Sequence, residues 1–65
     1  MDTKHTVRTV GENEREMAAL AVDLMNTAYR AADEAAKRGD LKKAEHQLER
    51  AETWRVRARN HGAAV

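Results

Sequence analysis

The sequence predicts an all-α protein that folds as a two-helix antiparallel hairpin. Two observations lead to this prediction: the dipeptide Gly39-Asp40 interrupts a long run of helix-forming residues, and alanines recur at three- and four-residue spacing on both sides of it. Glycine is the usual residue just past a helix end, where a positive φ is needed, and aspartate is a favoured N-cap. We therefore expect helices at about 13–38 and 41–61, joined by a tight turn.

The alanines also predict how the two helices pair. If the chain reverses at the Gly39-Asp40 turn, residues whose numbers sum to about 79 lie opposite one another. Small side chains at facing positions let two helices approach at the short end of the roughly 8–10 Å range of interaxial distances. The expected pairs are Ala35 with Ala44, Ala31 with Leu48, Ala28 with Ala51 and Ala21 with Ala58.

The chain is short for an independent domain. Its 65 residues include thirteen alanines, no cysteine and three scattered histidines, so the sequence offers neither disulfides nor a structural metal site to reinforce the core. A core of this size usually supplies only roughly 3–5 kcal/mol. We therefore expect self-association, most simply as a homodimer that forms an antiparallel four-helix bundle.

The first eleven residues are rich in β-branched side chains and basic in character. We expect residues 1–11 to form a flexible basic arm, with an arm that orders on a partner as the alternative. A ribbon-helix-helix DNA binder also begins with a short strand, but its first helix is much shorter than the one expected here. Asn13 is the expected N-cap, with Glu16 completing a capping box. The hairpin domain should span 12–62, which leaves 63–65 as a tail.

The first helix carries two apolar seams side by side, which is more than one partner helix can cover. The first seam is Met17, Ala21, Leu24, Ala28, Ala31 and Ala35, and the second is Ala18, Val22, Met25, Tyr29, Ala32 and Ala36. We expect the second helix to cover the first seam, so that the second seam faces outward as an interface. The predicted interface residues are Leu20, Val22, Met25, Tyr29, Ala32, Ala36 and Trp54.

The pattern around the turn, A-x-x-A-x-x-x-A-x-x-x-G-D-L-x-x-A-x-x-x-L-x-x-A from Ala28 to Ala51, resembles one tetratricopeptide hairpin. It is also similar to a hairpin of lactose-type phosphotransferase IIA proteins. A lone hairpin cannot form the stacked groove that binds peptides in the first family. The second family carries a phosphorylated histidine on the equivalent of the second helix, whereas this chain has Arg59 near that place. We therefore carry no function over from either resemblance.

No pattern in the sequence predicts catalysis. The chain has no serine, no phosphate-cradling glycine loop and no cluster of metal-binding side chains. We therefore expect a non-enzymatic protein with no catalytic residues, no cofactor and no metal. The sequence also lacks an apolar stretch of the roughly 20 residues that a membrane span needs. We expect no membrane contact and a cytoplasmic location.

The segment WRVRARNH, from Trp54 to His61, is the most suggestive local feature. Its basic side chains Arg55, Arg57, Arg59 and His61 could contact phosphates or an acidic partner beside an aromatic ring. They also suit a helix C-terminus, and in an antiparallel hairpin they would lie against the acidic start of the first helix. The sequence leaves three interpretations open, which are intramolecular pairing, an acidic protein partner and a nucleic acid.

The sequence therefore favours a small non-catalytic helical-hairpin protein that acts through protein–protein interaction, as a homodimeric regulator, adaptor or inhibitor. The alternative is a dimeric nucleic-acid-binding protein that uses Arg55, Arg57 and Arg59. A third interpretation is a subunit that only completes a larger complex.

Overall fold

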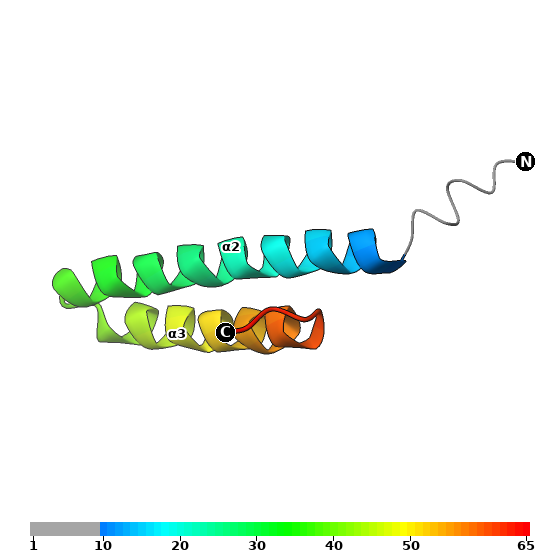
Figure 1. Cartoon of the computed structure of the whole chain (residues 1–65). Helices are drawn as coiled ribbons and strands as arrows, with labels where there is room; N and C mark the ends of the chain where they lie inside the picture. Colours follow the sequence, from blue (N-terminus) through cyan, green and yellow to red (C-terminus); the bar gives the residue numbers. More distant parts are fainter. Residues whose placement is uncertain (1–9) are drawn as a thin grey trace, which may run out of the picture.

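The computed structural model describes residues 10–65 and consists of two helices, α2 from Val10–Lys37 and α3 from Leu41–Asn60. The helices lie side by side and antiparallel, and the first turns of α2 reach beyond the end of α3 (Figure 1). Within residues 10–65 there is no strand. The predicted all-α hairpin is therefore confirmed. The predicted arm lies largely outside the described residues, although Val10 and Gly11 belong to α2.

The turn between the helices is built by local hydrogen bonds, as the Gly39-Asp40 pair predicted. Gly39 has a φ of 81°. Its N–H donates to the carbonyl of Ala36 at 3.0 Å, and the Asp40 N–H donates to that of Ala35 at 2.9 Å. These two bonds form a Schellman motif. The Asp40 carboxylate then accepts from the Lys43 N–H at 3.2 Å and so caps the start of α3.

The predicted start of the first helix is wrong by one turn. Helix α2 begins at Val10, so Asn13 is an exposed residue inside the helix and does not cap it with Glu16. The sequence predicts Gly11 in the arm, but a glycine costs a helix only about 1 kcal/mol relative to alanine and does not forbid it. The other end agrees more closely, because α3 stops at Asn60 and Gly62 follows with a φ of 100°.

The core between the helices is made almost entirely of alanine. Among residues 13–65, seven alanines and one methionine are buried: Ala21, Met25, Ala28, Ala32, Ala35, Ala44, Ala51 and Ala58. They include all six alanines of the three predicted alanine pairs. Leu48, which was expected to face Ala31, is instead 47% exposed.

The buried stripe of α2 lies between the two predicted seams. It takes Ala21, Ala28 and Ala35 from the first seam, and it takes Met25 and Ala32 from the second. Alanine side chains are small enough for α3 to settle over the groove between two rows rather than on one of them. The prediction that α3 covers only the first seam is therefore corrected.

Candidate interaction surfaces

The buried alanines of α3 divide its charged residues between two sides of the hairpin. Each buried alanine has one charged neighbour on either side in the sequence, and consecutive residues on a helix point about 100° apart. The residue before each alanine therefore projects to one side and the residue after it to the other. The three triplets are Lys43-Ala44-Glu45, Arg50-Ala51-Glu52 and Arg57-Ala58-Arg59.

The first side contains Trp54, and we call it the Trp54 face. A shallow hollow of ≈ 60 Å³ lies here between Met17, Leu20 and Ala21 of α2 and Trp54, Arg57 and His61 of α3. Met17 is 47% exposed and Leu20 is 52% exposed. The three- and four-residue spacing from Met17 continues the row along α2 through Leu24, Thr27 and Ala31. On α3 the same spacing through Trp54 gives Lys43, Gln47, Arg50, Trp54, Arg57 and His61.

The hollow is much smaller than a site for a small molecule. Ligand pockets usually measure about 300–1,000 Å³ and bury most of their ligand. A hollow of ≈ 60 Å³ with exposed apolar walls can instead receive one or two side chains from another protein. The guanidinium carbon of Arg57 lies 5.1 Å from the centroid of the Trp54 ring, which is within the range of a cation–π interaction. This interaction keeps both side chains at the rim of the hollow.

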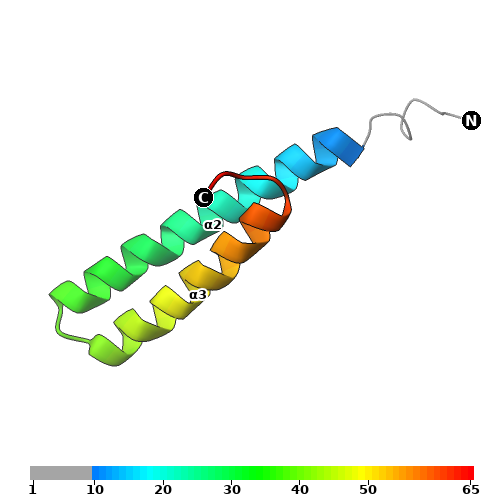
Figure 2. The ribbon, with the colours of Figure 1, turned by 60° about the horizontal axis from the view of Figure 1, so that its bottom comes forward.

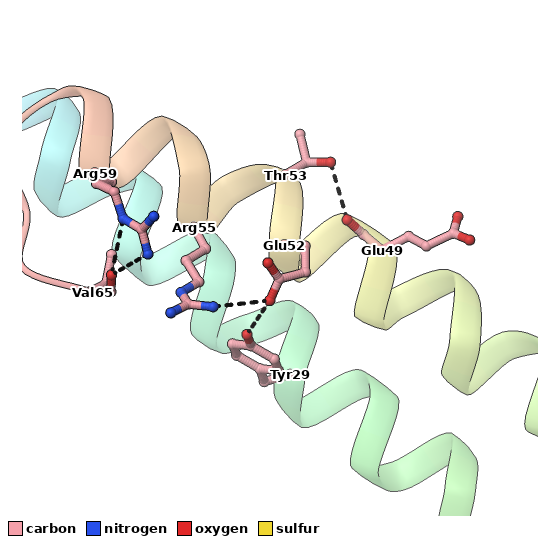
Figure 3. Close-up of polar contacts among 7 residues, drawn as sticks. All are labelled: Tyr29, Glu49, Glu52, Thr53, Arg55, Arg59 and Val65. Carbon is pink, nitrogen blue, oxygen red and sulfur yellow. Dashed lines mark hydrogen bonds and ion pairs between the residues drawn. The ribbon is translucent and has the colours of Figure 1, made fainter.

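The opposite side contains Tyr29, and we call it the Tyr29 face. The Tyr29 hydroxyl donates to the Glu52 carboxylate at 3.1 Å, and Arg55 Nη1 lies 3.5 Å from the same oxygen (Figure 3). This contact ties the middle of α2 to the middle of α3. The residues that share this side by spacing are Ala18, Val22 and Ala36 on α2 and Leu41, Glu45, Leu48 and Arg59 on α3.

The tail after α3 folds back along the hairpin (Figure 2). Arg59 holds it there, because Nε and one terminal nitrogen of its guanidinium donate to the main-chain oxygen of Val65 at 3.3 and 3.0 Å. Figure 3 shows this contact on the same side of the hairpin as Tyr29 and Arg55. Arg59 is thus engaged with its own chain.

The three predicted arginines therefore do not form one patch. Arg55 contacts Glu52, Arg57 lies over Trp54, and Arg59 binds the tail. Within residues 13–65 these side chains form no ion pair with the acidic residues of α2. The predicted contact between this end of α3 and the acidic start of α2 is made by His61, whose Nδ1 lies 2.6 Å from a Glu14 carboxylate oxygen.

The seven predicted interface residues do not lie on one surface. Leu20 and Trp54 are on the Trp54 face, whereas Val22, Tyr29 and Ala36 are on the Tyr29 face. Met25 and Ala32 are only 8% and 5% exposed, because they pack between α2 and α3. Their assignment to an outward seam is corrected. The residues of these two faces that sequence reasoning missed include six exposed or half-buried ones: Met17, Leu24, Leu41, Lys43, Leu48 and Arg50.

The described residues offer no metal-binding cluster. Among them, no group of three or more His, Cys, Asp and Glu side chains could hold a metal ion. Neither described helix has both the length and the apolar character of a membrane span. The features that remain for a functional argument are the Trp54 face and the Tyr29 face.

Comparisons of the chain with protein-family models, with curated proteins and with solved structures give no match. Function is therefore inferred from the two faces of the hairpin.

Proposed function

We propose that this chain is a small non-catalytic protein that acts through protein–protein interaction, as a homodimeric regulator, adaptor or inhibitor. The proposal rests on one observation, which is that the hairpin buries mostly alanine and leaves large apolar side chains exposed to solvent. Within residues 13–65 the buried set contains a single large side chain, Met25, while five large apolar side chains are 47–71% exposed. Alanine methyl groups remove little apolar surface from water, so two helices alone form a weak core. A second layer of helices would supply the missing burial.

The Tyr29 face is the surface that we assign to the dimer. It exposes Leu41 and Leu48, at 71% and 47%, beside the half-buried Val22 and Tyr29. Two such faces stacked together would complete a four-helix bundle.

The charges on this face also suit a second copy of the chain. On α3 its acidic residues, Glu45 and Glu52, lie nearer the turn, and its basic residues, Arg55 and Arg59, lie nearer the other end. A two-fold axis that reverses the chain direction would place the acidic half of one copy over the basic half of the other. A two-fold interface must be complementary to itself, and this distribution meets that requirement.

Sedimentation equilibrium tests the dimer, with Leu48→Glu as the variant and Leu20→Glu as its matched control. Both leucines are about half exposed, at 47% and 52%, but they lie on opposite faces. The wild-type chain should sediment at twice the 7.3 kDa of one chain at micromolar concentration. Leu48→Glu should weaken the dimer at least about tenfold, because it places a carboxylate in the interface, and Leu20→Glu should leave it intact.

A wild-type chain that stays monomeric, with a melting midpoint independent of concentration, would contradict the dimer, since mass action raises the midpoint of a dimer with concentration. A dimer that Leu20→Glu dissociates and Leu48→Glu does not would place the interface on the other face.

A further inference from the structure

The Trp54 face is divided into an apolar half and a basic half. Its row on α2 is apolar apart from Thr27 and includes Met17, Leu20 and Leu24. Its row on α3 carries Lys43, Arg50 and Arg57, all exposed and seven residues apart. Fourteen residues of helix separate the first of these cations from the last, which is about 21 Å. Since facing residues have numbers that sum to about 79, the apolar row lies beside Arg50 and Arg57, and Lys43 extends the basic row beyond it toward the turn.

A second copy of the chain fits this face poorly. If α2 packs on α2 of the partner, then α3 packs on α3, and the cations Lys43, Arg50 and Arg57 of both copies come together. If α2 packs on α3 instead, each basic row lies over the leucines of the other copy. The first arrangement juxtaposes like charges and the second buries unpaired ones, and both are costly.

The outer edge of the same face differs from the basic row, because it carries charges of both signs. On α2 the residues that border the apolar row away from α3 include the exposed acids Glu16, Asp23 and Glu34 and the cations Arg30 and Lys37. A membrane surface or a nucleic acid presents negative charge over a wide area and would meet these three acids as well as the basic row. A narrow partner that is negative along one edge only would meet the cations without meeting the acids.

We propose that the Trp54 face binds an amphipathic helix of another protein, with acidic residues along the edge that faces α3. The apolar side chains of that helix would lie over Met17, Leu20 and Leu24, and one of them would enter the hollow beside Trp54. Its carboxylates would meet Lys43, Arg50 and Arg57, spaced about two helical turns apart. This is the helix-in-groove mode of recognition, with apolar anchors for affinity and charges for orientation. It rests on the proposed function only in that both are forms of protein association.

A designed peptide tests the proposal on the full-length chain. The probe is a fluorescein-labelled 18-residue helical peptide with leucines at three- and four-residue spacing and glutamates along one edge, and its partner probe has lysines in place of the glutamates. Binding is followed by anisotropy and by the emission of Trp54, which is the only tryptophan. The glutamate peptide should bind in the micromolar range and shift the Trp54 emission to the blue. The lysine peptide should bind at least about tenfold more weakly.

Neighbouring lysines provide a matched control for the role of charge. Lys43 precedes the buried Ala44 and lies on the Trp54 face, whereas Lys42 lies on the back of α3. The double change of Lys43→Glu with Arg50→Glu should weaken the glutamate peptide about tenfold and strengthen the lysine peptide, while Lys42→Glu should change either affinity less than about twofold. Equal binding of the two peptides, or equal effects of Lys42→Glu and of the double change, would overturn the proposal.

The remaining measurements distinguish a helical partner from other partners, and peptide binding from dimer formation. Tighter binding to phosphatidylserine vesicles or to a 20-base-pair duplex than to the glutamate peptide would overturn the helix as occupant. Leu20→Glu should abolish peptide binding while the chain stays dimeric, and Leu48→Glu should keep peptide binding while the dimer dissociates. Loss of the dimer alone would contradict only the proposed function, and absence of peptide binding up to about 100 μM would contradict only this inference.

Discussion

His61 Nδ1 lies 2.6 Å from a carboxylate oxygen of Glu14, which is 47 residues earlier in the chain. The contact joins the C-cap of α3 to an early turn of α2, at the end of the hairpin farthest from Gly39. The two side chains are 32% and 46% exposed, so water screens the interaction. It connects the two helices at the end opposite the turn, beside the hollow at Trp54.

We expect Glu14→Gln and His61→Ala each to lower the free energy of unfolding by about 0.5–1 kcal/mol, as is typical of partly exposed pairs. In a double-mutant cycle the two losses should not add, because both changes remove the same contact. Urea unfolding followed by circular dichroism measures both. Glu16→Gln is the control, since Glu16 is an exposed carboxylate two residues away. A coupling energy of zero would show that the contact contributes nothing to stability.

Replacement of Gly39 should lower stability because of its positive φ and not because of a steric clash with neighbouring atoms. Its φ is 81°, and an added Cβ would meet no atom within 4 Å. Gly39→Ala should therefore destabilise the chain by about 1–2 kcal/mol, which is the penalty of an L-residue in the left-handed region. Chemical synthesis of the 65-residue chain allows a sharper test with D-alanine, which adopts positive φ freely. D-alanine should match or exceed glycine in thermal stability, and an equal loss with both enantiomers would contradict this account.

Met25→Glu should unfold the hairpin, because the side chain is 8% exposed and the core has no partner for a carboxylate among its alanines. We expect a loss of more than about 3 kcal/mol and a far-ultraviolet circular dichroism signal that collapses at 25 °C. Leu20→Glu and Asp23→Ala are the controls, because both residues are exposed and both chains should keep the helical signal. A folded Met25→Glu chain would mean that this side chain is not in the core.

The three arginines should prove to be structural rather than nucleic-acid-binding residues. Replacing Arg55, Arg57 and Arg59 with alanine removes contacts to Glu52, Trp54 and Val65. We expect the free energy of unfolding to fall by about 1 kcal/mol, from lost exposed contacts and lost packing of the arginine stems. Gel shifts of the wild-type chain with duplex DNA and RNA should show only weak, salt-sensitive binding. Submicromolar binding at physiological salt, abolished in a triple mutant whose melt is unchanged, would favour the nucleic-acid alternative.

The turn and the ends of the helices were predictable from sequence to different degrees. The Gly39-Asp40 turn depends on hydrogen bonds between residues at most five positions apart, so the local sequence contains all the information that it needs. The start of α2 was not predictable in this way. Several residues near Asn13 suit a first turn about equally well, and Gly11 lowers the stability of a helix without ending it.

The seven predicted interface residues are divided between two faces and the core for a different reason. Both seams of α2 satisfy the same helical periodicity, and they differ by only one residue in sequence, so either one, or the groove between them, could have met α3. The sequence already predicts that Ala44, Ala51 and Ala58 face the first helix, and the structure buries all three. The separation of charges in the triplets around them could therefore be predicted from the sequence, whereas the side of α2 that lies next to each charged row could not.

The sequence by itself determined the number of helices, the turn that joins them and the opposition of small residues along them, because capping and periodicity act over a few residues. Only the tertiary structure decided that Met25 and Ala32 lie inside, that Leu20 and Leu48 lie on opposite faces, and that Glu14 meets His61. Those relations depend on the rotation of each helix about its own axis. That rotation is set when α3 settles between two rows of alanines on α2, and no local pattern specifies it.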